Sequence, residues 1–253
     1  MPFKRRNAGK GHYYVDEDGS KFDGVTTLLS DGVPKPALIN WAANTTADYA
    51  VDHWDELSRN TISERINKLR RARFAERDRA AKRGTEVHAL AERLIRGEEV
   101  DVPDELAGHV ESYVKFLDEW KPVAVLVETP VANRRWRYAG TLDAVVDMPD
   151  GRRLLVDIKT ARSGIFPETA YQLAAYAGAE VYLDADGNEQ PMNELGISGA
   201  LGIWVRADGY DLYPVDITES THKTFLHIAH VARKTKDNKS LIGEALAPPE
   251  VAA

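Results

Sequence analysis

Apolar residues recur with helical spacing in one part of the chain, and segments typical of strands follow it. Between residues 104 and 120 the apolar positions lie three and four residues apart, which predicts a helix with one apolar face. These positions are Leu106, Val110, Tyr113, Val114, Leu117 and Trp120. Three runs rich in β-branched residues come next, separated by short polar turns, at 123–132, 138–148 and 153–160. They predict an antiparallel meander that the helix covers.

Turn residues and changes of period predict the elements on either side of this meander. Near the N-terminus, residues 12–19 and 24–29 predict a hairpin that turns at Asp18-Gly19. Helices are expected from 37 to about 97, because Pro34-Lys-Pro36 breaks the chain just before this segment. After the meander, the pattern predicts a helix at 168–181, strands at 199–205 and 210–215, and a helix at 218–233.

The order of these elements predicts an α/β (α+β) fold, with a central mixed sheet flanked by helices and an α-rich N-terminal extension. At 253 residues, of which 43% are hydrophobic, the chain is long enough to bury one substantial core. We expect residues 1–81 to form a hairpin and a basic helical region packed on that core. Residues 82–246 are expected to form the core itself. The tail, 247–253, has too little to bury and is expected to be disordered.

The turn between the last two strands of the meander sets their register. The segment Met148-Pro-Asp-Gly-Arg152 fits a three-residue hairpin loop. Pairing of the first and last residues of this segment places Asp143 opposite Asp157. Thr141 then lies opposite Lys159 on the same face. The other face is apolar throughout and consists of Leu142, Ala144, Val146, Leu154, Val156 and Ile158. Two aspartates this close favour either a bound cation or a raised pKa.

Composition limits which metals and which cellular locations fit the chain. There is no cysteine, which excludes disulfides, thiolate nucleophiles, Cys-ligated zinc and iron–sulfur clusters. A metal would therefore bind to oxygen and imidazole, which favours Mg²⁺ or Mn²⁺. No segment approaches the ~18 consecutive apolar residues that span a bilayer. The basic start is not followed by the apolar stretch of a signal peptide, so we expect a cytoplasmic protein with no membrane partner.

Positive charge is concentrated in one segment of an acidic chain. The formal net charge is −7, yet residues 64–83 contain nine basic side chains against three acidic ones. Such a run is more often a solvated helix face than a binding surface. Its position favours a binding surface here, because it leads directly into the segment that contains His88.

Four short motifs occur in a fixed order along the chain. They are His88 in Arg83-Gly-Thr-Glu-Val-His88, Gly140-Thr-Leu-Asp143, Asp157-Ile-Lys159 and Gln172-Leu-Ala-Ala-Tyr176. Together they resemble the PD-(D/E)XK nuclease superfamily, in its RecB-like exonuclease branch, over about residues 82–182. The chain is similar to small phage-encoded members without an iron–sulfur cluster. Such a resemblance implies a restriction-endonuclease-like core. Leu142 departs from the proline that usually precedes the motif aspartate.

The resemblance implies a role for each motif residue. Asp143 and Asp157, with the backbone carbonyl of Ile158, would hold a Mg²⁺ or Mn²⁺ ion, and His88 would complete its coordination. Asp143, Asp157 and Lys159 would be catalytic, with Lys159 positioning the attacking water or offsetting negative charge.

Residues around these motifs have two interpretations each. The resemblance implies that Gln172 and Tyr176 hold DNA, although both also fit an ordinary amphipathic helix. Arg79 and Arg83 would contact phosphates without sequence preference. Glu128 has three possible roles: it supports the metal ligands by hydrogen bonding, it binds a second metal ion, or it is a surface charge on an edge strand.

A metal-dependent DNA exonuclease is therefore the function that the sequence predicts, in recombination, replication or repair of the phage type. The expected substrates are linear duplex ends or single strands, and a recombination or replication protein is a further expected partner. If the chain is phage-encoded, its location is the host cytoplasm. A structure-selective endonuclease and a non-catalytic DNA-binding scaffold are the alternatives. There is no Gly-x-x-x-x-Gly-Lys-[Ser/Thr] phosphate loop, so a Walker-type motor is not part of this chain.

Overall fold

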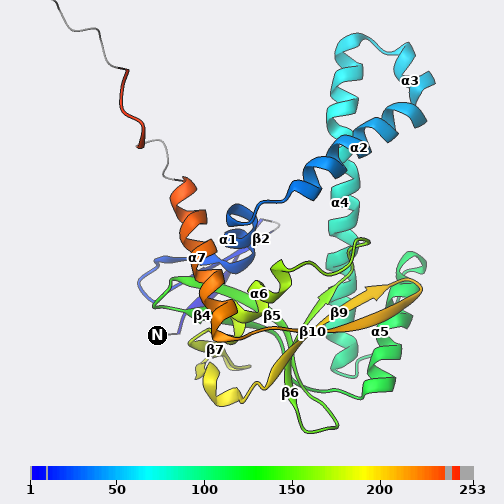
Figure 1. Ribbon diagram of the computed structural model, residues 1–253. Coiled ribbons are helices and arrows are strands. Elements are labelled where there is room, and N and C mark those ends of the chain that lie inside the picture. The colour runs from blue at the N-terminus through cyan, green and yellow to red at the C-terminus, as the bar shows by residue number, and fades with distance from the viewer. Residues whose placement is uncertain (1, 10, 237–240, 246–253) are drawn as a thin grey trace, which may run out of the picture.

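A mixed β-sheet forms the centre of the protein, and helices cover both of its faces (Figure 1). The computed structural model describes residues 2–9, 11–236 and 241–245. Five strands form the main part of the sheet in the order β4-β5-β6-β9-β10, and only β6 and β9 run parallel. They are β4 (Val123–Asn133), β5 (Tyr138–Asp147), β6 (Arg153–Lys159), β9 (Gly199–Arg206) and β10 (Gly209–Val215). This confirms the predicted α/β fold with a mixed sheet.

The N-terminal segment adds strands to the same sheet. It contains β1 (Lys4–Ala8), β2 (Gly11–Val15) and β3 (Lys21–Gly24), and β3 pairs in parallel with the start of β5. The predicted turn at Asp18-Gly19 is confirmed, since β2 and β3 form a hairpin around it. The predicted strand at 24–29 is wrong. That segment begins α1 (Val25–Gly32), because the apolar residues after Gly24 have helical spacing and bury one helix face.

Strand β5 changes partner along one edge, and this change creates an opening in the sheet. Its first two residues pair with β3, and residues 144–147 pair with β6. Within the described sheet, residues 140–143 have no backbone ladder on that edge, while β4 pairs along the other edge. The pairs Ala144 with Val156 and Asp147 with Arg153 follow the predicted register. The ladder ends just before it reaches Asp143 and Asp157.

Two apolar cores lie on opposite faces of the sheet. One lies under α4 (Ile62–Ile95) and α5 (Ala107–Trp120) and contains most of the face that the hairpin pattern marked as apolar. The other lies under α1, α6 (Glu168–Ala177) and α7 (Glu219–Lys236). It contains Val145 and Leu155, and Leu155 shares the face of Asp157, so that face of β6 is covered by helices. Leu142 also belongs to this second core, contrary to the predicted face, so the side chains of β5 do not alternate regularly between Leu142 and Val145. Asp143, which lies between them, contacts His88 of α4.

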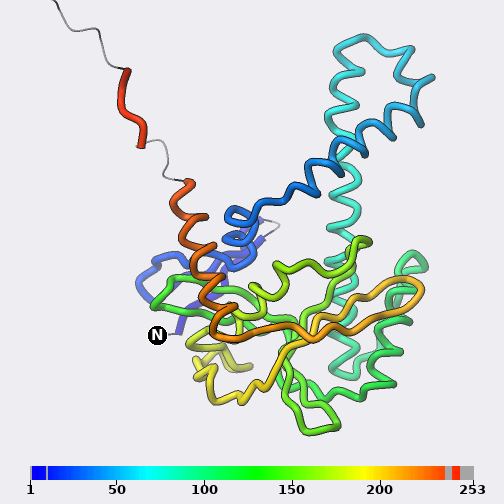
Figure 2. Tube along the Cα trace, in the orientation of Figure 1, coloured from blue at the N-terminus to red at the C-terminus, as the bar shows by residue number. Residues whose placement is uncertain are grey.

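A helical extension projects from the core (Figures 1 and 2). It consists of α2 (Pro36–Asp52), α3 (Trp54–Arg59) and the first half of α4, and α2 has no buried residue. Helix α4 begins at a capping box formed by Thr61 and Glu64. It then continues unbroken across the predicted boundary between residues 81 and 82. The hairpin of the N-terminal segment joins the core sheet, whereas the basic helical region extends away from it.

Several short elements complete the described chain. A 3₁₀ turn at Asp104–Leu106 precedes α5, and the strands β7 (Val181–Leu183) and β8 (Glu189–Pro191) follow α6. The helix predicted at 168–181 ends earlier, at Ala177, and Val181 begins β7 instead. A second 3₁₀ turn, Met192–Leu195, leads to β9. Among the described residues, no helix combines the length and apolar character that crossing a membrane requires. The predicted disordered tail, 247–253, lies outside the described residues.

The contact between buried Tyr138 and half-buried His222 predicts a dependence of stability on pH. The Tyr138 hydroxyl lies 2.9 Å from His222 Nε2, and burial lowers the pKa of His222 below its ordinary value of 6.5. The unfolded chain therefore takes up this proton first as the pH falls. The stabilising effect of the neutral ring is present above pH 6.5 and is lost as the pH falls toward the folded-state pKa.

We expect the free energy of unfolding to fall more in the wild type than in His222→Gln between about pH 7.5 and about pH 5.5. Urea denaturation at both pH values measures this difference. His230→Gln on the exposed face of the same helix is the control and should behave as the wild type does. Equal pH dependence in His222→Gln and the wild type would contradict the prediction.

Candidate metal centre

The opening in the sheet is occupied by the side chain of Asp143. In a continued ladder, the Ile158 N–H would face the backbone of β5. It donates instead to Asp143 Oδ2 at 2.8 Å. A carboxylate oxygen thus replaces a backbone acceptor where β5 and β6 separate. Ile158 itself is buried, and its carbonyl remains only a predicted ligand.

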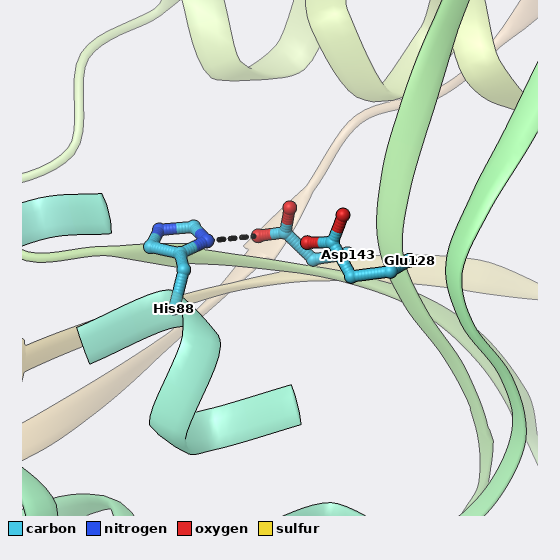
Figure 3. Close-up of side chains that lie close together, drawn as sticks. All are labelled: His88, Glu128 and Asp143. Carbon is cyan, nitrogen blue, oxygen red and sulfur yellow. Dashed lines mark ion pairs between the residues drawn. The ribbon is translucent and has the colours of Figure 1, made fainter. Parts of the chain in front are cut away.

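Three side chains from three separate elements converge on this opening (Figure 3). They are His88 from α4, Glu128 from β4 and Asp143 from β5, and one ligand atom from each lies within 4.8 Å of the others. His88 Nδ1 is 3.4 Å from Asp143 Oδ2. All three side chains are partly exposed, so an ion from solvent can reach them. The structure therefore brings the predicted His88 and Asp143 together.

Glu128 is closer to the centre of this group than the sequence suggested. A bulge near the start of β4 shifts its register against β5, and the pairs Val127 with Ala144 and Thr129 with Leu142 leave Glu128 level with Asp143. Glu128 has a positive φ of 49°, which is uncommon for a residue with a side chain. Burial, and then the charges of Asp143 and Glu92, raise the pKa of the Glu128 carboxyl. A bound cation would offset this unfavourable burial of negative charge.

Asp157 lies beside this group and has different partners. Its carboxylate forms an ion pair with Lys159 Nζ at 2.6 Å and accepts a hydrogen bond from Gln172 Nε2 at 3.0 Å. Burial raises the pKa of Asp157, and the charge of Lys159 opposes that rise. Burial by itself would lower the pKa of Lys159, but Asp157 and Asp143 outweigh it and raise the pKa. Lys159 is therefore a half-buried positive charge next to the metal-ligand group.

Helix α6 holds the ion pair of Asp157 and Lys159 in place through Gln172. Lys159 Nζ donates to Gln172 Oε1 at 3.2 Å, and Gln172 Nε2 lies 3.3 Å from the Tyr176 hydroxyl. Tyr176 is 2% exposed, and its ring lies directly on Gly140. Direct contact of Tyr176 with DNA does not fit this burial, whereas a role in positioning Gln172 does. Gln172 is half-buried and holds both ends of the Asp157–Lys159 pair.

The predicted arginines occupy two different environments. Arg79 is exposed and forms an ion pair with Glu76 at 2.6 Å, one turn earlier on α4. Arg83 is half-buried, and its Nε is buried with no hydrogen-bond partner among the described residues. His109 from the start of α5 lies close enough for the charge of Arg83 to lower its pKa, after burial as the larger cause. Sequence analysis did not single out His109, because it belongs to none of the four motifs.

A second contact that the motifs did not indicate comes from the N-terminal hairpin. The Tyr14 hydroxyl and Thr141 Oγ1 form a hydrogen bond of 2.7 Å, so β2 reaches the opening. Burial raises the pKa of Tyr14, which keeps it a neutral phenol. The N-terminal strands therefore help to fix the backbone that precedes Asp143.

The donor atoms in this site fit a hard divalent cation. Carboxylate oxygens and one imidazole nitrogen are suitable ligands for Mg²⁺ or Mn²⁺, and the chain has no cysteine to favour a softer metal. The group of His88, Glu128 and Asp143 would hold the ion, with Asp157 and Lys159 beside it. Such an arrangement can polarise a phosphoryl group and position a water molecule.

Comparison with known proteins adds little to this picture. No family model matches the sequence, and no curated protein matches it. Among solved structures, the chain is similar to the protein of the crystal structure of SSO0001, with 12% sequence identity and a TM-score of 0.34. The alignment covers 84% of this chain and 75% of that chain. The function is therefore argued from the residues of the site.

Replacing Gly140 tests how tightly α6 packs over the opening. An added Cβ at Gly140 would lie 2.5 Å from Tyr176 Cε1, and the buried ring has little room to move. We expect Gly140→Ala to lower the free energy of unfolding by about 1–3 kcal/mol, as overpacking typically does. Urea denaturation measures this effect. Gly11→Ala is the matched control, because its nearest neighbour would be 3.9 Å away. Equal urea midpoints for Gly140→Ala and Gly11→Ala would contradict the close packing of Tyr176 on Gly140.

Proposed function

We propose that the protein is a divalent-metal-dependent nuclease that hydrolyses DNA phosphodiester bonds and acts at strand ends. One observation carries the proposal. A group of metal-binding side chains, His88, Glu128 and Asp143, lies next to the ion pair of buried Asp157 and half-buried Lys159. A scaffold protein needs neither a cation site nor a buried carboxylate paired with a lysine, because burying such a charge is costly and contributes little to stability.

A bound Mg²⁺ or Mn²⁺ would supply Lewis-acid chemistry, which withdraws charge from a phosphate oxygen and lowers the pKa of water. The residues of the chain supply what remains. Asp143 and Glu128 provide the negative charge that attracts the cation, and His88 provides an imidazole nitrogen as a further ligand. Asp143 is held in place by the Ile158 N–H, so it is oriented before any ion binds.

Lys159 is the residue best suited to act on the reacting phosphate. Its pKa is raised, so it carries a positive charge across the physiological range. Asp157 and Gln172 fix its Nζ from two sides. Negative charge develops on the phosphate oxygens during hydrolysis, and a fixed ammonium stabilises it without reorganisation. Lys159 can also donate a hydrogen bond to the attacking water.

Hydrolysis in this site balances without a further reactant. The water oxygen forms a new bond to phosphorus, and the bond from phosphorus to the 3′ oxygen breaks in line with it. One water proton is lost to solvent or to a neighbouring base, and the 3′ oxygen gains a proton as it leaves. No covalent enzyme intermediate and no oxidant is needed.

The basic part of α4 is the surface best placed to bind the DNA backbone. Arg70, Arg71 and Arg73 are exposed, and no ion pair involves them within the described part of the chain. Arg83 lies nearer to His88, five residues before it on the same helix. Phosphate contacts of this kind give affinity without sequence preference and weaken with salt. They fit an enzyme that degrades DNA from its ends.

The resemblance of the motifs supports the finer assignments of this proposal. They are a restriction-endonuclease-like core, the RecB-like exonuclease branch of the PD-(D/E)XK superfamily, and a role in phage-type recombination, replication or repair. A cytoplasmic location and a recombination or replication protein as partner belong to the same proposal.

Degradation of end-labelled linear DNA, duplex and single-stranded, tests the proposal. With Mg²⁺ or Mn²⁺ present, we expect Asp143→Ala and Lys159→Ala each to slow hydrolysis by about 100-fold or more. Asp143→Ala removes a ligand of the cation, and Lys159→Ala removes the ammonium that stabilises developing negative charge. Glu86→Gln is the control. Glu86 lies two residues before His88 on α4, and among the described residues its one ion pair is with exposed Lys82, so hydrolysis should continue at the wild-type rate.

Covalently closed circles distinguish the possible outcomes. The proposal expects circles to survive while linear DNA is lost. Cleavage of circles would contradict an end-acting nuclease and would indicate an endonuclease. Binding of DNA without any metal-dependent hydrolysis by the wild type would contradict the proposal and favour a scaffold.

A further inference from the structure

A cavity of about 470 Å³ is lined by Trp204, the register partner of Lys159, and none of the motifs includes this cavity. It lies between the segment that joins β6 to α6, the first turn of α6, and the strands β9 and β10. Its walls are mainly apolar and include three aromatic side chains, Phe166, Trp204 and Tyr213. The volume is within the range of roughly 300–1,000 Å³ that is typical of small-ligand sites.

The register of β6 with β9 and the position of α6 both place this cavity near the proposed catalytic lysine. Lys159 and Trp204 are register partners in the parallel pair of β6 and β9, so their side chains are neighbours on the same face of the sheet. Thr169 and Ala170 from α6 line the cavity. Gln172, one turn or less further along the same helix, holds Lys159. A base bound in the cavity and a phosphate that reaches Lys159 could therefore belong to the same short stretch of one strand.

Trp204 forms a rigid wall of the cavity. Its indole Nε1 donates to the Ala161 carbonyl at 2.7 Å, and the Arg206 guanidinium lies 4.2 Å from the ring centroid. The segment that joins β6 to α6 is packed closely as well, because a Cβ at Gly202 would lie 2.7 Å from Ile165 Cδ1. The cavity is thus already formed in the free protein.

The other two aromatic rings are unusually exposed. Phe166 is 45% exposed and Tyr213 is 43% exposed, and neither ring packs against another aromatic ring in the described structure. Flat apolar faces at the rim of a cavity suit a flat ligand. Nucleobases stack on such rings, and the stacking tolerates any base because each has a π-face.

We propose that this cavity receives an unpaired nucleobase of the DNA strand whose phosphate lies at Lys159. This inference rests on the proposed nuclease function and specifies its substrate as a single strand or a frayed end. In an intact duplex both faces of each base are already stacked, so a base must leave the helix to enter the cavity. Aromatic walls favour binding with little preference among the bases.

Binding of DNA in the absence of divalent metal tests the inference without hydrolysis. The probes are a fluorescein-labelled oligothymidylate and a blunt duplex of the same length, measured by anisotropy in EDTA. We expect Phe166→Ala to weaken binding of the single strand about tenfold, which corresponds to about 1.4 kcal/mol. Duplex binding should change less than about twofold, because phosphate contacts supply it. Phe166→Tyr keeps the ring and should bind both probes as the wild type does.

Trp136→Ala is the matched control, because Trp136 is 40% exposed and lies in the turn between β4 and β5, outside the cavity. Unchanged binding of the single strand by Phe166→Ala, or equal weakening of both probes, would overturn the inference.

Photocross-linking provides a second measurement on the unmodified protein. An oligothymidylate with one 5-iodouracil should cross-link to Phe166, Trp204 or Tyr213, as located by mass spectrometry of the peptides. Cross-links confined to residues outside the cavity would overturn the inference.

Failure of this inference and failure of the nuclease proposal give different results. If the wild type hydrolyses DNA with Mg²⁺ or Mn²⁺ while Phe166→Ala binds the single strand normally, the cavity assignment is wrong and the nuclease stands. If the single strand binds through Phe166 but no metal supports hydrolysis, the cavity binds bases and the nuclease proposal is wrong.

Discussion

The site depends on the change of partner along β5. If β6 followed β5 along its whole length, the Ile158 N–H would bond to backbone, and Asp143 would be one of many side chains on a closed sheet. Because the ladder ends at Ala144, the Asp143 carboxylate accepts that N–H and enters the opening. His88 from α4 and Glu128 from β4 reach the same place. The hydrogen bond between Ile158 and Asp143 thus links the architecture of the sheet to the geometry of the proposed metal centre.

The second feature is the burial of charge beneath α6. Asp157 is buried and Lys159 is half-buried, and Gln172 supports the pair because it donates to Asp157 and accepts from Lys159. Removing two charges from water is costly, and apolar residues of similar volume often stabilise a protein equally well or better. This pair therefore makes better sense as part of a site than as a stabilising contact. Gly140 allows Tyr176, and with it α6, to approach closely enough to hold the pair.

Local patterns predicted much of the fold and part of the site. The turn at 148–152 gave the register of β5 and β6 correctly over every pair that forms, since short hairpin loops fix register by themselves. The helix at Val25 was missed because a short apolar run fits both a strand and a helix. The position of Glu128 depends on a bulge and on a positive φ, and the burial of Tyr176 depends on packing between distant elements. Such features arise from tertiary contacts that no local pattern contains.

Location of a bound ion tests the central claim most directly. Crystals saturated with Mn²⁺ would show the ion as an anomalous scattering peak. The account predicts this peak within bonding distance of Asp143 and Glu128, with His88 next to it and the pair of Asp157 and Lys159 alongside. An empty opening at saturating Mn²⁺, or an ion bound only at another acidic surface, would contradict it.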